Sequence, residues 1–257
     1  TTGGSNVVIG MEAGDAMTDN SYNTIIGKGA FSTANQGEDR NIAIGWGAMD
    51  SVDAPTSDSN VVIGTLAGQG GAAAMIGCIA IGDAAMNSTA ANAQTGTIAI
   101  GTNALTALTS GANNLAVGYN SLLGNTTGNR NTAIGYGAMD GSGGATVLDS
   151  DDNVFLGYDS GGGTWTTAVS EFNVGIGNYT LDGAMNGALN NTAVGYAALS
   201  SITVGDGNTG IGFRAGDNIT DGTYNTFLGY SSGTEANNFS TGDSCTLIGA
   251  FADASGV

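Results

Sequence analysis

The candidate catalytic and metal-binding residues of this chain are carboxylates, serines and two cysteines. Its 257 residues include no histidine. Histidine is the usual general base and the commonest metal ligand of proteins. The segment GYSSG (229–233) has the spacing of a nucleophile elbow around Ser231, but that motif needs a following helix and a histidine partner. The segment GDGNTG (205–210) matches a dinucleotide-binding pattern, yet it leads into a strand-like segment. We interpret both as products of a glycine-rich composition and predict that the chain is not an enzyme.

Carboxylates raise the separate question of calcium. Asp149, Asp151 and Asn153 begin like an EF-hand loop. However, Val154 and Ser160 stand where that loop needs its glycine and its glutamate. We therefore expect no cofactor and interpret the acidic segments as a solvated, self-repelling surface, with calcium binding as the alternative.

The overall charge limits the classes of partner. The chain has 22 acidic and 4 basic residues, a net charge of −18, which argues against binding the phosphate backbone of a nucleic acid. No stretch is long and apolar enough to span a bilayer, so we expect no membrane insertion by this segment.

The strongest pattern in the sequence is a repeat. A short aliphatic run that ends in glycine recurs at intervals of 17 to 22 residues, as in NIAIGWGAMD (41–50) and NTAIGYGAMD (131–140). Repetition at this period is typical of solenoid architectures. We call the recurring glycine the anchor column; it comprises Gly10, Gly27, Gly45, Gly64, Gly82, Gly101, Gly118, Gly135, Gly157, Gly177, Gly195, Gly212, Gly229 and Gly249.

Other columns are defined by their distance from the anchor. The residue before it is always Ile, Val or Leu (the aliphatic column), and the residue three after it is always Ala, Ser or Thr (the small column). Four residues before the anchor, Asn recurs except at Cys78, Thr97 and Cys245. This Asn column comprises Asn6, Asn23, Asn41, Asn60, Asn114, Asn131, Asn153, Asn173, Asn191, Asn208 and Asn225.

These columns predict an all-β parallel solenoid of about 14 coils. The runs before each anchor are mostly β-branched and bounded by Asn and Gly, which is strand chemistry with turns at both ends. We expect two short strands and two turns in each coil. Glycine supplies a turn conformation or a close approach, and the stacked Asn side chains can form a hydrogen-bonded ladder. Cys78 and Cys245 are then too far apart to form a disulfide, and we interpret them as small buried thiols.

The strands are apolar on both faces. The residue two before the anchor (the middle column) is never polar, although alternation places it on the face opposite the aliphatic column. One face can fill the coil interior, and the other then needs a partner. Aromatic residues directly after the anchor, such as Trp46 and Tyr136, add apolar surface. We therefore predict self-association.

The phrase NTAIGY with linkers such as GNRNT (128–132) resembles the solenoid repeats of phage tail fibres and the head repeats of trimeric autotransporter adhesins. The resemblance implies a left-handed β-roll, a homotrimer and a fibre on a virion or cell surface. Its implied partner is a cell-surface glycan or protein receptor.

Our first functional hypothesis is therefore a non-enzymatic, adhesive fibre segment on a virion surface or outside the cell, most consistent with a phage tail fibre or a related virion protein. A bacterial trimeric adhesin head or extracellular filament subunit is the alternative, and an ice-binding solenoid is the third. We treat residues 1–257 as one repeat domain, suspected to be part of a longer protein. The long insertions 141–152 and 161–172 are candidate contact surfaces. Within the second, Trp165 can either stack on a sugar ring or pack under its own loop.

Overall fold

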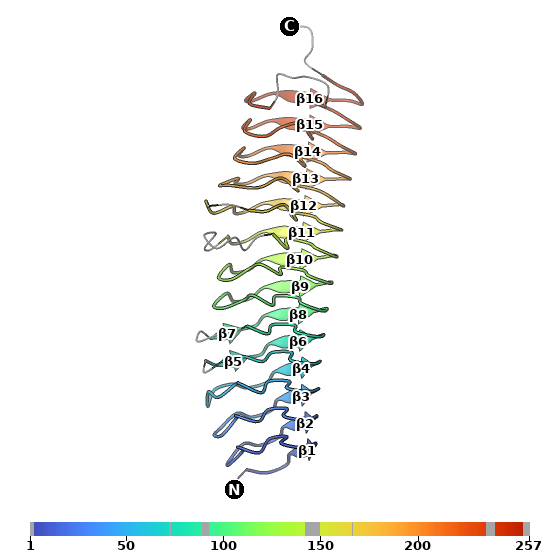
Figure 1. Cartoon of the computed structure of the whole chain (residues 1–257). Coiled ribbons are helices and arrows are strands. Elements are labelled where there is room, and N and C mark those ends of the chain that lie inside the picture. Colours follow the sequence, from blue (N-terminus) through green and yellow to red (C-terminus); the bar gives the residue numbers. More distant parts are fainter. Residues whose placement is uncertain are drawn as a thin grey trace. The chain divides into compact units, whose positions relative to one another are not determined.

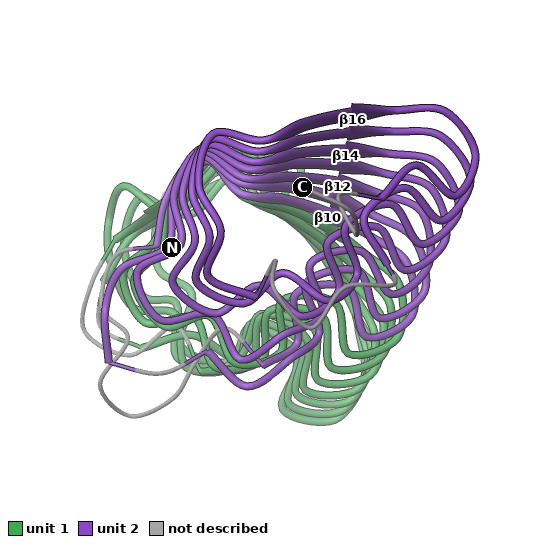
Figure 2. Ribbon diagram, turned by 90° about the horizontal axis from the view of Figure 1, so that it is seen from above, with its two compact units in different colours: residues 1–129 green, residues 130–257 purple. Residues whose placement is uncertain are grey.

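The computed structural model describes residues 3–71, 73–88, 93–141, 150–165, 167–234 and 240–253. Within these ranges the chain consists of strands and turns without any helix. It divides into two compact units, unit 1 (residues 1–129) and unit 2 (residues 130–257), coloured separately in Figure 2. Each unit is a parallel β-solenoid, which confirms the predicted fold class.

Each coil contributes one three-residue strand, which ends directly before its anchor glycine (Figure 1). In unit 1 the strands pair in parallel in the order β1 (Val7–Ile9), β2 (Thr24–Ile26), β3 (Ile42–Ile44), β4 (Val61–Ile63), β6 (Ile79–Ile81), β8 (Ile98–Ile100) and β9 (Leu115–Val117). In unit 2 the order is β10 (Thr132–Ile134), β11 (Val154–Leu156), β12 (Val174–Ile176), β13 (Thr192–Val194), β14 (Thr209–Ile211), β15 (Thr226–Leu228) and β16 (Thr246–Ile248). Within each unit, equivalent residues face each other without any shift in register, as in Val174↔Thr192.

The expectation of a second strand in every coil was wrong. Among the described residues, only β5 (Met75–Ile76) and β7 (Gln94–Thr95) pair outside the main strands. The remainder of each coil is not extended, because residues two and four after the anchor have φ near +50°, as at Tyr179 (58°) and Leu181 (47°). That left-handed conformation interrupts an extended strand.

Neighbouring coils account for this unusual backbone. The N–H of Tyr179 donates to the carbonyl of Tyr158 in the preceding coil (2.9 Å), whereas that of Leu181 donates to Ala198 in the following coil (3.2 Å). The same alternation recurs at Arg214 and Gly216. Left-handed residues cost free energy in isolation, but here each one directs a backbone donor to a partner.

Glycine is required at the anchor for two separate reasons. The anchors have φ between +125° and +145°. Moreover, a Cβ atom on Gly177 would lie 2.5 Å from the carbonyl oxygen of Gly195 in the next coil. Both the conformation and the close approach of the backbones therefore exclude a side chain.

The middle column fills the interior of the coil. In the strands β2 to β15 it is buried, while the flanking residues are partly exposed. Across the interior it faces the residue four after the anchor (the core column), and in most coils one of the two residues is large and the other small. Phe155 lies against Gly161, where an added Cβ would be 2.8 Å from the ring. In another coil small Ala193 is combined with large Leu199, and both are fully buried. Large and small residues therefore alternate to keep the core volume filled.

The Asn column forms the predicted ladder. Asn173 shows the pattern: its Oδ1 accepts the backbone N–H of Asn191 (3.0 Å), and its Nδ2 donates to the carbonyl of Ala188 (2.9 Å). Asn173 in turn donates its own N–H to Oδ1 of Asn153 (3.0 Å). In unit 1 the ladder runs from Asn6 to Cys78, whose N–H bonds Oδ1 of Asn60 (2.8 Å). Each buried side chain thus satisfies backbone groups of the coils beside it.

Candidate binding surfaces

The residues that resembled catalytic or calcium sites have structural roles. Ser231 lies in the left-handed position two after an anchor, with φ 49°, and its N–H bonds the carbonyl of Phe213 (2.8 Å). Asp151 and Asp152 both pair with Arg130, at 2.9 and 2.7 Å. Asp149 lies outside the described residues. Across the described ranges, no group of three His, Cys, Asp or Glu residues is placed to hold a metal ion.

The two cysteines are free thiols. Cys78 is fully buried, whereas Cys245 is partly exposed, so the interpretation as buried thiols holds for the first only. Burial raises the pKa of the Cys78 thiol above its ordinary value. A thiol that resists ionisation is a poor nucleophile, which suits a packing role in the Asn column.

Trp165 does not form a surface contact. Its side chain is fully buried; its Nε1 donates to the carbonyl of Gly161 (3.0 Å), and its ring meets Phe155 edge to face at 5.9 Å. The hypothesis of an exposed sugar platform is therefore wrong, and the alternative of packing under its own loop is confirmed. The physical reason is that the indole packs against Phe155, whose ring fills the coil interior beside Gly161. Residues 142–149 of the other insertion lie outside the described residues.

An outward-facing apolar surface runs along the main strands of each unit. We call the aliphatic and β-branched side chains on this face the apolar sheet face. Ile176 and Ile211 on unit 2 are 42% and 40% exposed although they lie inside the stack. The face continues from coil to coil because the strands pair in register. Contiguous apolar surface of this kind marks an interaction site.

A row of aromatic rings follows the turn after the strands of unit 2. Successive rings lie 4.9 to 5.6 Å apart and are stacked or edge to face. The row comprises Tyr136, Tyr158, Tyr179, Tyr196, Phe213, Tyr230 and Phe251. Such contacts between rings stabilise the stacking of coils.

Three carboxylates gather near this row, on consecutive coils. Burial, reinforced by the charges of Asp159 and Asp140, raises the pKa of Asp182 to about 6. Burial also raises the pKa of Asp140, together with the charge of Asp159. These groups repel one another at neutral pH, so they oppose folding there instead of supporting it.

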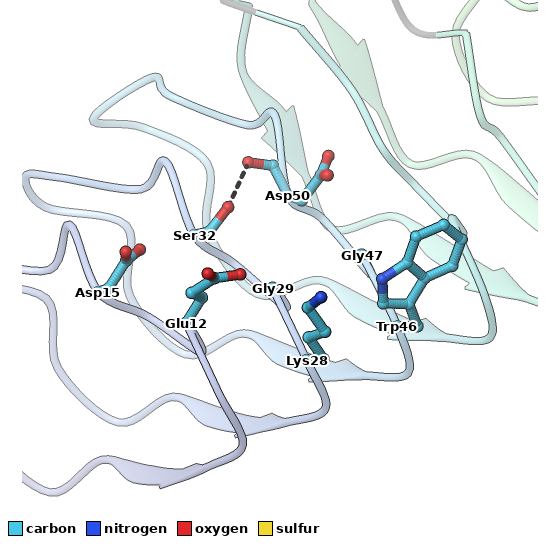
Figure 3. A pocket seen from close by; sticks show the side chains of 8 residues that line it. All are labelled: Glu12, Asp15, Lys28, Gly29, Ser32, Trp46, Gly47 and Asp50. Carbon is cyan, nitrogen blue, oxygen red and sulfur yellow. Dashed lines mark hydrogen bonds between the residues drawn. The ribbon is translucent and has the colours of Figure 1, made fainter.

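Unit 1 carries a groove of about 520 Å³ on three consecutive coils (Figure 3). It is lined by Glu12, Asp15, Lys28, Gly29, Ser32, Trp46, Gly47 and Asp50. Two consecutive coils have glycine in the position two after the anchor, and a Cβ atom on Gly29 would meet nothing within 4 Å. In the other coils of unit 1 that position carries a side chain; Leu66 of the next coil overlies Gly47, where an added Cβ would be 2.9 Å from it. The absence of a side chain at Gly29 opens the groove between the residues on its rims.

The groove combines an aromatic ring with charges of both signs. Trp46 is 54% exposed. Lys28 is the one base for which the described residues provide no ion pair, since Arg40, Arg130 and Arg214 are each paired with aspartates. Sequence reasoning had missed this site. The signal that could have located it is the succession GKG (27–29) and GWG (45–47).

Comparison with known proteins adds no identification, because no family model, curated protein or solved structure matches the chain. Over the described residues we also find no helix that is long and apolar enough to cross a membrane.

Proposed function

We propose that the chain is a non-enzymatic, adhesive fibre segment in which three copies of the solenoid associate about one axis as left-handed β-rolls. A phage tail fibre or a related virion protein is the form that we favour, exposed on the virion surface or outside the cell. A bacterial trimeric adhesin head or a filament subunit is the alternative with the same architecture. A cell-surface glycan or protein is the expected receptor.

The apolar sheet face carries this proposal. Every coil has Ile, Val or Leu immediately before the anchor, on the outer side of the strand, so an aliphatic column runs along the outer face of each unit. Burying such a face against other copies removes it from water at about 25 cal/mol per Å². A small coil interior gives limited stability on its own, and association supplements it.

The mass of the chain in solution tests the proposal. Sedimentation of the full chain should give about three times 25.1 kDa. Ile176→Lys places a charge on the apolar sheet face and should shift the mass toward one chain. Asn35→Lys, at an exposed residue away from the strands, should leave it unchanged. A wild-type monomer would contradict the proposal, and open-ended assemblies would favour the filament subunit.

A specific observation also supports the ice-binding alternative. Four consecutive strands of unit 2 place threonine in register on the outer face, at Thr192, Thr209, Thr226 and Thr246. A flat row of regularly spaced threonines is the feature that function needs. Thermal hysteresis in the monomeric Ile176→Lys variant and the wild type tests it: hysteresis in either would favour this alternative.

A further inference from the structure

We propose that the groove of unit 1 is a saccharide-binding site, which takes a neutral pyranose with one ring face on Trp46. The inference deepens the proposed adhesive function and rests on it, since it names the ligand class and its place. It concerns a surface distinct from the apolar sheet face: the groove residues follow the turn at the anchor glycine, whereas the sheet face precedes it.

Charge disfavours an anionic ligand. The carboxylates of Glu12, Asp15 and Asp50 line the groove together with the ammonium of Lys28. An anion would be repelled by the three carboxylates, which outnumber the single ammonium. A neutral polyhydroxylated molecule avoids this penalty, because each hydroxyl can donate to a carboxylate and accept from an ammonium.

The hydrogen-bonding groups are available for such a ligand. Figure 3 shows the carboxylate of Glu12 and the ammonium of Lys28 directed toward the space above Gly29. Ser32 at the groove wall can both donate and accept; its hydroxyl donates weakly to the carbonyl of Asp50 (3.4 Å). Hydrogen bonds to charged groups are roughly twice as strong as neutral ones, which suits a site open to water.

Shape and the aromatic ring select a sugar among polyols. Trp46 presents an exposed indole beside the groove, and a pyranose has an apolar face of C–H groups as well as a polar rim. A volume of about 520 Å³ is within the range of small-molecule sites. The missing side chain at Gly29 gives the sugar ring room to approach the backbone.

The two tryptophans make the test direct, because Trp46 is exposed and Trp165 is fully buried. Acrylamide quenching of the full chain should therefore report on Trp46. We expect at least one of glucose, galactose, mannose and N-acetylglucosamine, or their disaccharides, to protect Trp46 at millimolar concentration. N-acetylneuraminic acid, which carries a negative charge, should bind roughly tenfold more weakly.

Two substitutions and a matched control locate the binding. Gly29→Asn fills the groove in a position where the chain already accepts asparagine with positive φ, at Asn103 and Asn120. It should weaken protection roughly tenfold or more without loss of thermal stability. Trp46→Ala should abolish saturation transfer from protein to saccharide in NMR spectra. Tyr119→Ala removes another exposed ring of unit 1 outside the groove and should change neither result.

The proposal is overturned if no neutral saccharide protects Trp46, if N-acetylneuraminic acid binds better, or if binding survives Gly29→Asn. It is also overturned if Trp46 is already shielded from acrylamide in the assembled protein. The mass is measured on the same samples. A trimer without saccharide binding therefore removes this inference alone, whereas binding by a monomer removes the fibre architecture and leaves the site.

Discussion

Asn173 is hydrogen-bonded to the coils on both sides of it and is fully buried. Asn173→Ala leaves the N–H of Asn191 and the carbonyl of Ala188 without their partners in the interior. Each buried unsatisfied group costs about 1–3 kcal/mol, so we expect a loss of roughly 2–5 kcal/mol in the free energy of unfolding. Urea unfolding measures it, with the exposed Asn35→Ala as control. Equal stability of the two variants would show that the ladder is not stabilising.

Asp182 should make the folded chain less stable as the pH rises, whereas an aspartate in a stabilising ion pair would make it more stable. Its pKa is about 6 in the folded chain, against 3.8 for an ordinary aspartate. The folded state therefore takes up a proton before the unfolded state does as the pH falls. The contribution of Asp182 to the unfolding free energy rises from about pH 7 to about pH 4 and then stays constant.

The isosteric variant Asp182→Asn isolates this contribution. Above about pH 6 it should be more stable than the wild type, by the order of 1 kcal/mol after allowance for solvent screening of a half-exposed group. The difference should shrink toward about pH 4. Urea midpoints of both proteins across that range provide the measurement, and a difference that grows on acidification would contradict the assignment.

The turn after each strand is the element that makes stacking possible, and two glycine substitutions compare its anchor with a turn position that has open space. Gly177→Ala combines a φ of +133° with a Cβ 2.5 Å from the carbonyl oxygen of Gly195. We expect it to cost about 3 kcal/mol or more. Gly29→Ala has a φ of +64° and open space around the new Cβ, so it should cost only about 1 kcal/mol. Thermal unfolding of both variants makes the comparison; similar losses would contradict the special requirement for glycine at the anchor.

The coil core is an element whose two columns compensate for each other. Phe227 is fully buried, and a Cβ on Gly233 would lie 2.4 Å from its ring. Phe227→Ala should cost about 3–5 kcal/mol through the cavity that it leaves. Gly233→Leu alone should be at least as harmful, because Phe227 occupies the space. The double variant recreates the pairing of Ala193 with Leu199, whose φ is +49°.

A double-mutant cycle tests this compensation. We expect the double variant to be more stable than either single variant, with an interaction energy above about 2 kcal/mol. Recovery will be incomplete, since Gly216 of the preceding coil leaves space for the phenylalanine ring. Additive losses in urea unfolding would show that the two columns do not share volume.

The strands and the ladder could be predicted from the sequence because they repeat: the pattern of an Asn, three residues and an anchor Gly occurs eleven times. The turns could not. Tyr179 and Leu181 are poor candidates for positive φ, and only their bonds to adjacent coils make that conformation favourable. Trp165 was ambiguous for a similar reason, since its burial depends on a contact with Phe155, ten residues away in the sequence. The groove depends on the side chain that is missing at Gly29, a relation that appears only when the repeats are aligned.

At the scale of the whole molecule, net charge and apolar surface have opposite effects on the association of chains. Each chain has a net charge of −18, so three associated chains would carry three times that charge. Repulsion among them weakens association, while the apolar sheet face favours it. Salt shortens the distance over which the repulsion acts, from about 30 Å at 0.01 M to about 8 Å at 0.15 M. It leaves the attraction between apolar surfaces almost unchanged.

We therefore expect the trimer fraction to increase with salt. Sedimentation at a protein concentration where both species are present should show the average mass rising between about 0.01 and 0.15 M NaCl. Ile176→Lys should remain dissociated throughout, because salt does not restore the apolar contact that the substitution removes. A trimer fraction that falls as salt is added would indicate that ion pairs between chains hold the assembly. In that case the apolar sheet face would not be the interface.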